Sequence, residues 1–150
     1  IGWMTIIFGI IMYFSDKLRQ TKNIESNFSF KSAIIIGFLQ ILSLIPGVSR
    51  SGITITAARF LNFKRLDSAK ISFLLSIPTL GAVSVYGISN LINSDDLEFL
   101  MINLLAIIFA FIFSYFTIKY FLKYIKQFSL KIFVIYRIFI GIVILFLIYL

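Results

Sequence analysis

Long apolar runs dominate this chain and restrict what it can fold into. Three runs of about 19 to 22 residues and a shorter one at the start carry at most one charge each: 71–92, 97–118, 132–150 and 1–15. A helix rises about 1.5 Å per residue, so about 20 apolar residues cross a hydrocarbon core of roughly 30 Å. Backbone polar groups in lipid must be satisfied within the segment, which favours helices. The chain is therefore predicted to be all-α, a polytopic membrane helix bundle.

Composition supports a membrane protein and excludes several kinds of chemistry. The chain is 60% hydrophobic and 13% charged, whereas soluble domains are roughly 45–50% apolar and about 25% charged. The net charge of +8 is interpreted as lysine and arginine in cytoplasmic loops, so no nucleic-acid partner is expected. There is no cysteine and no histidine. Disulfides, thiolate metal sites and a Ser–His–Asp triad are thereby excluded.

The connectors between the apolar runs differ in charge. Three are basic, residues 17–31, 64–70 and 119–131, and one is acidic, residues 93–98. Cytoplasmic loops of membrane proteins carry an excess of lysine and arginine. We therefore predict that the three basic connectors face the cytoplasm and that the acidic connector faces outside.

This topology makes residues 32–63 a re-entrant helix–loop–helix hairpin. If Lys31 and Lys64 are both cytoplasmic, the chain between them enters and leaves by the same face. As helices, residues 32–45 and 52–63 would measure about 21 Å and about 18 Å, too short to cross alone. The alternative is one helix over residues 32–50 that ends in water. It would place Lys64 outside, against the charge rule.

The expected tip of the hairpin reads Pro-Gly-Val-Ser-Arg-Ser-Gly-Ile-Thr over residues 46–54. A charge at membrane depth is costly, so Arg50 indicates a functional site. Its guanidinium presents a planar fork of donors that matches phosphate oxygens. Glycines let the backbone approach an anion closely, and hydroxyls add hydrogen bonds. A helix that starts at the tip would also point its N–H groups at a bound anion.

Two further residues lie inside apolar runs and leave alternatives open. Pro78 either kinks its helix for packing or frees a carbonyl as a ligand. Arg137 either extends its side chain to the cytoplasmic interface beside Lys131 or pairs with a polar group in the bundle.

The order of motifs resembles the undecaprenyl-diphosphate phosphatases, the bacitracin-resistance proteins. The resemblance rests on Gly37–Gln40, on Pro46–Thr54 as the family's PGxSRSxxT element, on Ser72–Pro78 and on Tyr136-Arg137. It implies a multi-pass hydrolase of the bacterial inner (cell) membrane, with its active site open to the outer face. It also implies removal of one phosphate from a C55 polyprenyl diphosphate, which recycles the lipid carrier for cell-wall synthesis and gives bacitracin resistance.

The resemblance also assigns roles to the residues of the tip. Arg50 would clamp the diphosphate and neutralise charge on the transferred phosphoryl group, with Ser49 as the second catalytic residue. Ser51 and Thr54 would hydrogen-bond phosphate oxygens. The remaining assignments are the glycines of the tight backbone, a proline that ends the first short helix and a glutamine that supports the loop: Gly47, Gly52, Pro46 and Gln40.

In the resembled family, the first half supplies a glutamate-rich element, a serine, a histidine and a divalent cation, Mg²⁺ or Ca²⁺. This chain has no histidine and no ExxxE pattern. Residues 1–150 are therefore expected to form a single membrane domain, a C-terminal fragment without metal ligands that is inactive alone. Its expected partners are the lipid bilayer, the polyprenyl diphosphate and the missing N-terminal half. A homodimer is also possible on the sequence alone.

Two other functions were weighed against this interpretation. A lipid phosphatase of the phosphatidic-acid type needs a Ser-Arg pair followed, after five intervening residues, by histidine, and this chain has Thr56 at that position. Half of a transporter or flippase for an anionic lipid or phosphate-bearing substrate remains the alternative, because broken helices at the midplane also bind anionic substrates.

Overall fold

The computed structural model describes residues 1–92 and 97–149, and these residues form helices without any strand. The acidic connector predicted to face outside lies largely beyond the described residues. The elements are α1 (Gly2–Lys17), α2 (Ile24–Asn27), α3 (Phe30–Gln40), a 3₁₀ turn η1 (Ile41–Leu44), α4 (Arg50–Phe60), α5 (Arg65–Ile92), α6 (Leu97–Gln127) and α7 (Lys131–Tyr149). Helices α5, α6 and α7 are each long and apolar enough to cross a membrane. The all-α prediction of a polytopic membrane protein is confirmed.

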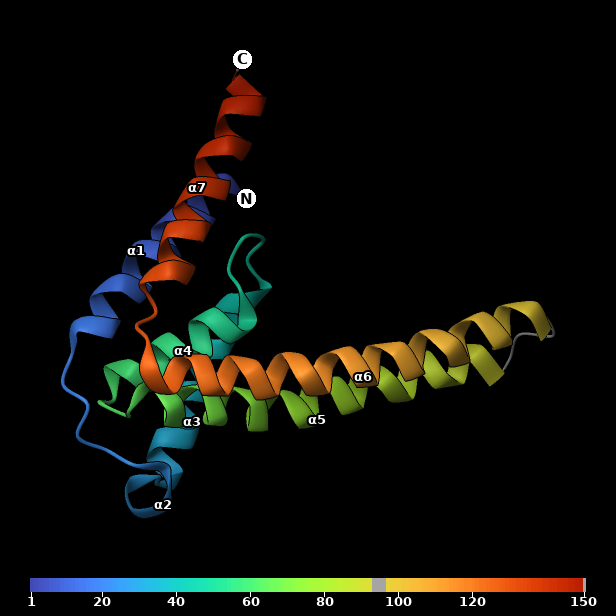
Figure 1. The fold of residues 1–150 in the computed structure, drawn as a ribbon, viewed down its shortest axis with the longest axis horizontal. Helices are drawn as coiled ribbons and strands as arrows, with labels where there is room; N and C mark the ends of the chain where they lie inside the picture. Colours follow the sequence, from blue (N-terminus) through green and yellow to red (C-terminus); the bar gives the residue numbers. More distant parts are fainter. Residues whose placement is uncertain (93–96, 150) are drawn as a thin grey trace.

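The helices are arranged in two antiparallel pairs with a short hairpin between them (Figure 1). Helices α1 and α7, from opposite ends of the chain, lie side by side, while α5 and α6 form a long hairpin that projects from the rest. Helices α3 and α4 occupy the region where the two pairs meet. Glycines let α1 and α7 approach closely: a Cβ on Gly141 would lie 3.1 Å from the carbonyl oxygen of Gly2. Such small residues are typical of helix contacts in membranes.

Two helices extend further than the apolar pattern predicts. Helix α5 begins at Arg65 and α6 continues to Gln127, so much of the basic segments 64–70 and 119–131 is helical rather than connecting loop. Asp67 lies in the first turn of α5 and Lys126 in the last turn of α6, where a negative and a positive charge, respectively, are favourable. The backbone ladder therefore continues past the residue at which the apolar run ends.

Residues 30–60 form two short helices, and the chain reverses direction between them. Ser29 caps α3 by accepting a hydrogen bond from the backbone N–H of Ser32, and the loop after η1 reverses the chain before α4. The two ends of the hairpin return to one place, since the rings of Phe28 and Phe63 lie 6.0 Å apart. The alternative of one continuous helix over residues 32–50 is wrong.

Helix α4 is the most deeply buried element. Its residues from Gly52 to Arg59 are all buried, with one apolar cluster on each side. The first cluster joins α1, α4, the start of α5, α6 and α7 through Met12, Ile55, Ala69, Ile125, Leu130 and Val134. The second joins α3, α4 and α5 through Ile36, Ala57, Ala58, Phe63 and Ile71.

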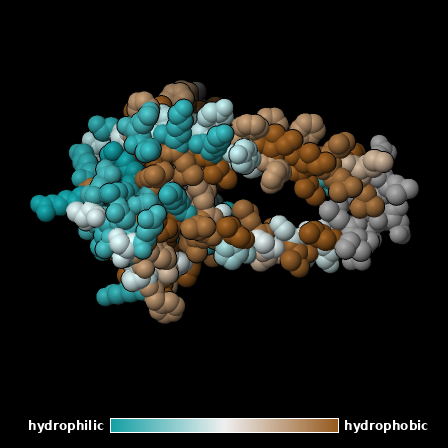
Figure 2. Space-filling view, turned by 60° about the horizontal axis from the view of Figure 1, so that its bottom comes forward, coloured by the Kyte–Doolittle hydropathy of each residue, from teal (hydrophilic) through white to brown (hydrophobic). Residues whose placement is uncertain are grey.

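A buried charged cluster, centred on Asp16, lies at the C-terminal end of α4, which we call its base. The Asp16 carboxylate accepts hydrogen bonds from Arg65 Nε at 2.6 Å and Nη2 at 3.0 Å, and from the Leu130 N–H at 3.2 Å. The fully buried Arg59 lies 3.8 Å from the same carboxylate. This cluster brings all three basic connectors to one end of the molecule, where the surface is hydrophilic (Figure 2). Their common position agrees with a shared membrane face.

Candidate functional site

The loop between η1 and α4 takes its shape from Pro46 and Gly47. A residue before proline is disfavoured in the helical conformation, and Ile45 is extended, with ψ 123°. Gly47 has φ +98°, which L side chains rarely adopt. Ser49 then caps α4, its Oγ accepting from the Gly52 N–H at 3.2 Å. The proline–glycine pair therefore ends one helical segment and lets the chain reverse into the next.

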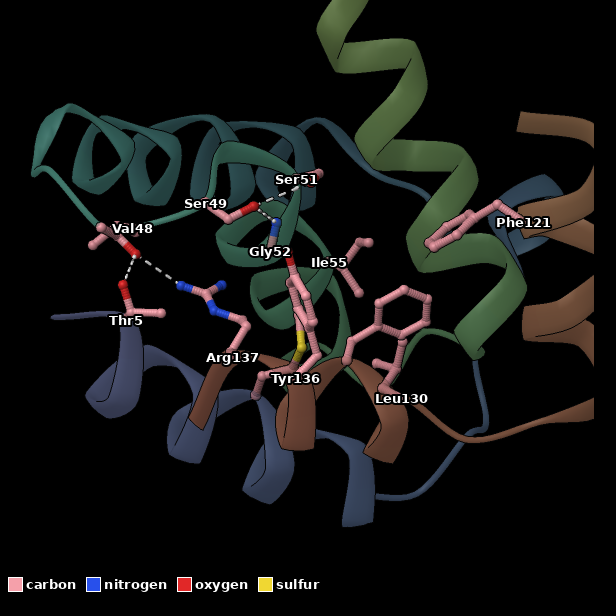
Figure 3. Close-up of a pocket in the computed structure, with 13 residues that line it drawn as sticks. Thr5, Val48, Ser49, Ser51, Gly52, Ile55, Phe121, Leu130, Tyr136 and Arg137 are labelled. Carbon is pink, nitrogen blue, oxygen red and sulfur yellow. Dashed lines mark hydrogen bonds between the residues drawn. The ribbon is translucent and has the colours of Figure 1, made fainter. Parts of the chain in front are cut away.

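Helices α1 and α7 hold this loop from outside the hairpin. The Gly47 carbonyl oxygen accepts a hydrogen bond from Arg137 Nη2 at 2.9 Å and another from Thr5 Oγ1 at 3.3 Å. A Cβ at Gly47 would lie 2.5 Å from the carbonyl oxygen of Ile1. The loop is thus fixed between two helices that come from the two ends of the described chain (Figure 3).

A cavity of about 430 Å³ opens beside the loop. Its polar wall is formed by the loop, the first turn of α4 and one side of α7: Gly47, Ser49, Ser51, Gly52 and Arg137. Its apolar wall consists of side chains of α1, α4, α6 and α7, among them Met12, Ile55, Phe121, Leu130 and Phe133. The cavity therefore combines hydrogen-bond donors on one side with hydrocarbon on the other (Figure 3).

Arg137 supplies the charge of this cavity. The residue is only 9% exposed, and Figure 3 shows its guanidinium between the loop and α7. Of the two interpretations left open by the sequence, pairing with a polar group in the bundle is the one observed, since the partner is the Gly47 carbonyl. An arginine held inside the protein at this position keeps its charge, so the cavity is electropositive.

Arg50 does not line this cavity. It is the first residue of α4, and its Nη1 donates to Thr79 Oγ1 at 3.0 Å. Thr79 lies on α5, directly after Pro78, so the Arg50 side chain is turned toward α5. The arginine singled out at the tip and the arginine in the cavity are two different residues.

The other predicted residues divide in the same way. Gly47, Ser49, Ser51 and Gly52 line the cavity, and the two serine hydroxyls are 3.3 Å apart. Thr54 does not reach it: its hydroxyl is buried and lies 2.6 Å from Ser72 Oγ on α5. Neither Pro46, exposed in the loop, nor Gln40, the last residue of α3, lines it. No local pattern in the sequence singles out Thr5, whereas Arg137 stands out as a lone charge in an apolar run.

The polar groups of the cavity suit an anion better than a cation. Its lining contains a guanidinium, hydroxyls and the N-terminal turn of a helix, which favours negative charge, and it contains no carboxylate. The Asp16 carboxylate, which lies beside Arg59 near the other end of α4, is paired with Arg65. Among residues 1–92 and 97–149, no three histidine, cysteine, aspartate or glutamate residues are grouped. These residues do not fit Mg²⁺ or Ca²⁺, which prefer several oxygen ligands, carboxylates among them.

Known proteins share this sequence over most of its length. The chain is 55% identical over 150 residues to an undecaprenyl-diphosphatase of Pelagibacter ubique, covering 99% of this chain and 58% of that protein. It is 43% identical over 139 residues to an undecaprenyl-diphosphatase of Elusimicrobium minutum, covering 93% and 52%. The chain thus spans about half the length of these curated relatives. The family described as bacitracin resistance protein BacA matches residues 1–143, and the chain belongs to this family.

Proposed function

We propose that this chain provides the diphosphate-binding hairpin of an undecaprenyl-diphosphate phosphatase. The enzyme would release one phosphate from the C55 lipid carrier, in the bacterial inner membrane and from a site open to the outer face. One observation carries the proposal: the Pro46–Thr54 segment folds into a loop and the start of α4, and its two serines share an electropositive cavity with Arg137. The names of the relatives agree with this chemistry.

The depth of the cavity supports a re-entrant hairpin. The basic connectors gather at the Asp16 cluster, beside Arg59 near the end of α4. Helix α4 has 11 residues, so its first turn lies about 16 Å from that end. This is about half of a hydrocarbon core of roughly 30 Å. Irregular backbone at this depth is tolerated where it lines a wet cavity, and the loop lines the cavity through Gly47, Val48 and Ser49.

The roles proposed for the residues are electrostatic. Ser49, Ser51 and the first N–H groups of α4 would hold phosphate oxygens. Arg50, at the first position of α4, would reach the diphosphate from the side of α5. Phosphoryl transfer depends mainly on positioning and on stabilising charge on the transferred group. No residue of this chain is assigned to the activation of water, and none to a divalent cation.

The test is phosphate release from undecaprenyl diphosphate in proteoliposomes. The 150-residue chain would be fused to the part of the Pelagibacter relative that lies outside the match, and compared with the chain alone. We expect hydrolysis by the fusion, none by the chain alone, and a loss of about 10²–10³ in rate for Arg50→Ala in the fusion. Arg19→Ala is the matched control, because Arg19 is exposed in a basic connector.

Two results would contradict the proposal. Unchanged hydrolysis by the Arg50→Ala fusion, at equal membrane levels, would remove Arg50 from the reaction. Movement of the lipid diphosphate across the bilayer without any phosphate release would identify a carrier or flippase instead.

A further inference from the structure

We propose that Arg137 binds a phosphate group in the cavity, as a guanidinium separate from Arg50. This inference deepens the proposed function and rests on it. It concerns a residue of α7 that lies 90 positions from its contact in the loop, far outside the Pro46–Thr54 segment.

Arg137 is a buried charge that uses only part of its hydrogen-bonding capacity. Arg137 is 9% exposed, and no acidic residue is paired with it in the part of the chain that the structure describes. A guanidinium has five N–H donors, and Arg137 uses Nη2 on the Gly47 carbonyl. Among the residues that the structure describes, Arg59 Nε is the only buried side-chain nitrogen or oxygen without a hydrogen-bond partner, so the remaining donors of Arg137 are open to the cavity that this residue lines. An anion in the cavity would pair with these donors.

Bracing the loop does not require a charge. The neutral hydroxyl of Thr5 also lies within hydrogen-bond distance of the Gly47 carbonyl, at 3.3 Å, and shares its single proton with the Ile1 carbonyl at 3.1 Å. A second neutral donor would complete its two acceptor positions. The planar, permanently charged fork of an arginine is instead suited to bidentate contacts with phosphate.

The guanidinium of Arg137 lies against the start of α4. A Cβ on Gly52 would lie 2.6 Å from Arg137 Nη1, so the guanidinium reaches the helix because position 52 is glycine. The first N–H groups of a helix have no partner within it, and they favour a bound anion. The guanidinium, the helix start and the hydroxyls of Ser49 and Ser51 therefore converge on one cavity.

The experiment measures binding by the purified 150-residue chain in lipid nanodiscs. The probes are geranylgeranyl diphosphate and inorganic diphosphate, so that the two arms separate a lipid ligand from a free anion. Affinity is followed by thermophoresis and by the ligand-induced rise in melting temperature. Arg137→Gln is expected to weaken binding about ten- to a hundredfold, the effect of losing one charge-assisted hydrogen bond. Arg19→Gln, a change at an exposed arginine, is the control and is expected to bind as the wild type does.

A second variant tests the position of the guanidinium without removing its charge. Gly52→Ala places a methyl group 2.6 Å from Nη1 and 3.1 Å from Ser49 Cβ. Because Nη1 must then shift, the variant is expected to weaken binding about tenfold. The matched control is Gly81→Ala on α5, where an added Cβ meets nothing within 4 Å. It is expected to leave the affinity unchanged. This variant decides the matter if Arg137→Gln does not fold.

The outcomes separate the inference from the proposed function. Wild-type affinity in both Arg137→Gln and Gly52→Ala would overturn the inference and leave Arg137 as a brace of the loop. Absence of diphosphate binding by the wild-type chain itself would overturn the binding role of the hairpin as well.

Discussion

The buried charge cluster at the base of α4 provides the sharpest stability prediction. The Asp16 side chain is 5% exposed and is the acidic partner of Arg59, whose side chain is 0% exposed, and of Arg65, whose side chain is 27% exposed. Asp16→Asn keeps the shape of the side chain but removes its charge. It leaves the guanidinium groups of Arg59 and Arg65 without this counter-charge. The NH₂ group of the new amide also faces an N–H group that donated a hydrogen bond to the carboxylate.

The expected loss is about 3 kcal/mol in the free energy of unfolding. Removing one partner of a buried ion pair costs about 3–5 kcal/mol, whereas an exposed pair contributes about 0.2–1 kcal/mol. Arg65 is partly solvated, which lowers the cost. Arg59 retains hydrogen bonds to the carbonyl oxygens of Asp16, Leu18 and Phe63, which lowers it further. The value is therefore expected at the lower end of the buried range.

The measurement is unfolding in mixed micelles at increasing mole fraction of dodecyl sulfate. Trp3 on α1 is the only tryptophan and serves as the fluorescent probe. Glu25→Gln is the matched control, because Glu25 is an exposed carboxylate on α2, and it should stay within about 0.5 kcal/mol of wild type. A loss below about 1 kcal/mol for Asp16→Asn would refute the argument, since it would show that water solvates the cluster as it solvates a surface pair.

The remaining predictions concern the loop, its support and the topology. Gly47→Ala should lose more than about 2 kcal/mol in the same assay, because φ +98° is strained for alanine and the methyl group meets a backbone carbonyl; Gly37→Ala, with open space around it, should not be destabilised. Thr54→Val should lose about 1–3 kcal/mol in the free energy of unfolding, because it leaves the buried hydroxyl of Ser72 on α5 without this partner. Thr54→Ser should retain most of the stability, and equal stability of the two variants would contradict this prediction. A single cysteine at Lys126 should react with an impermeant thiol reagent only from the cytoplasmic side and one at Ser94 only from outside; labelling of both from one side would exclude the topology.

The elements of this fold were largely predictable because they depend on neighbours in the sequence. About 20 apolar residues in a row favour a membrane helix in any context. The residues Pro46 and Gly47 disfavour helix for reasons of backbone sterics alone. The charge of the connectors then required residues 32–63 to turn back. The ends of α5 and α6 were misplaced, because hydrogen bonding within a helix does not stop where the apolar run stops. The first helix of the hairpin was predicted to continue to residue 45, whereas α3 ends at Gln40 and a 3₁₀ turn follows.

The composition of the cavity depended on contacts between distant residues. Nothing in the sequence near Arg137 indicates that it meets Gly47, because this contact requires α7 to pack on α1 and the loop to reach both. The direction of Arg50 was equally hidden, since a residue at the start of a helix can face either side until its neighbours are placed. The structure set Thr79 beside it and turned it toward α5. The sequence by itself determined which residue types gather at the tip, through local steric and charge rules. The tertiary structure decided which of them face the cavity, because packing fixes how each helix is rotated about its axis.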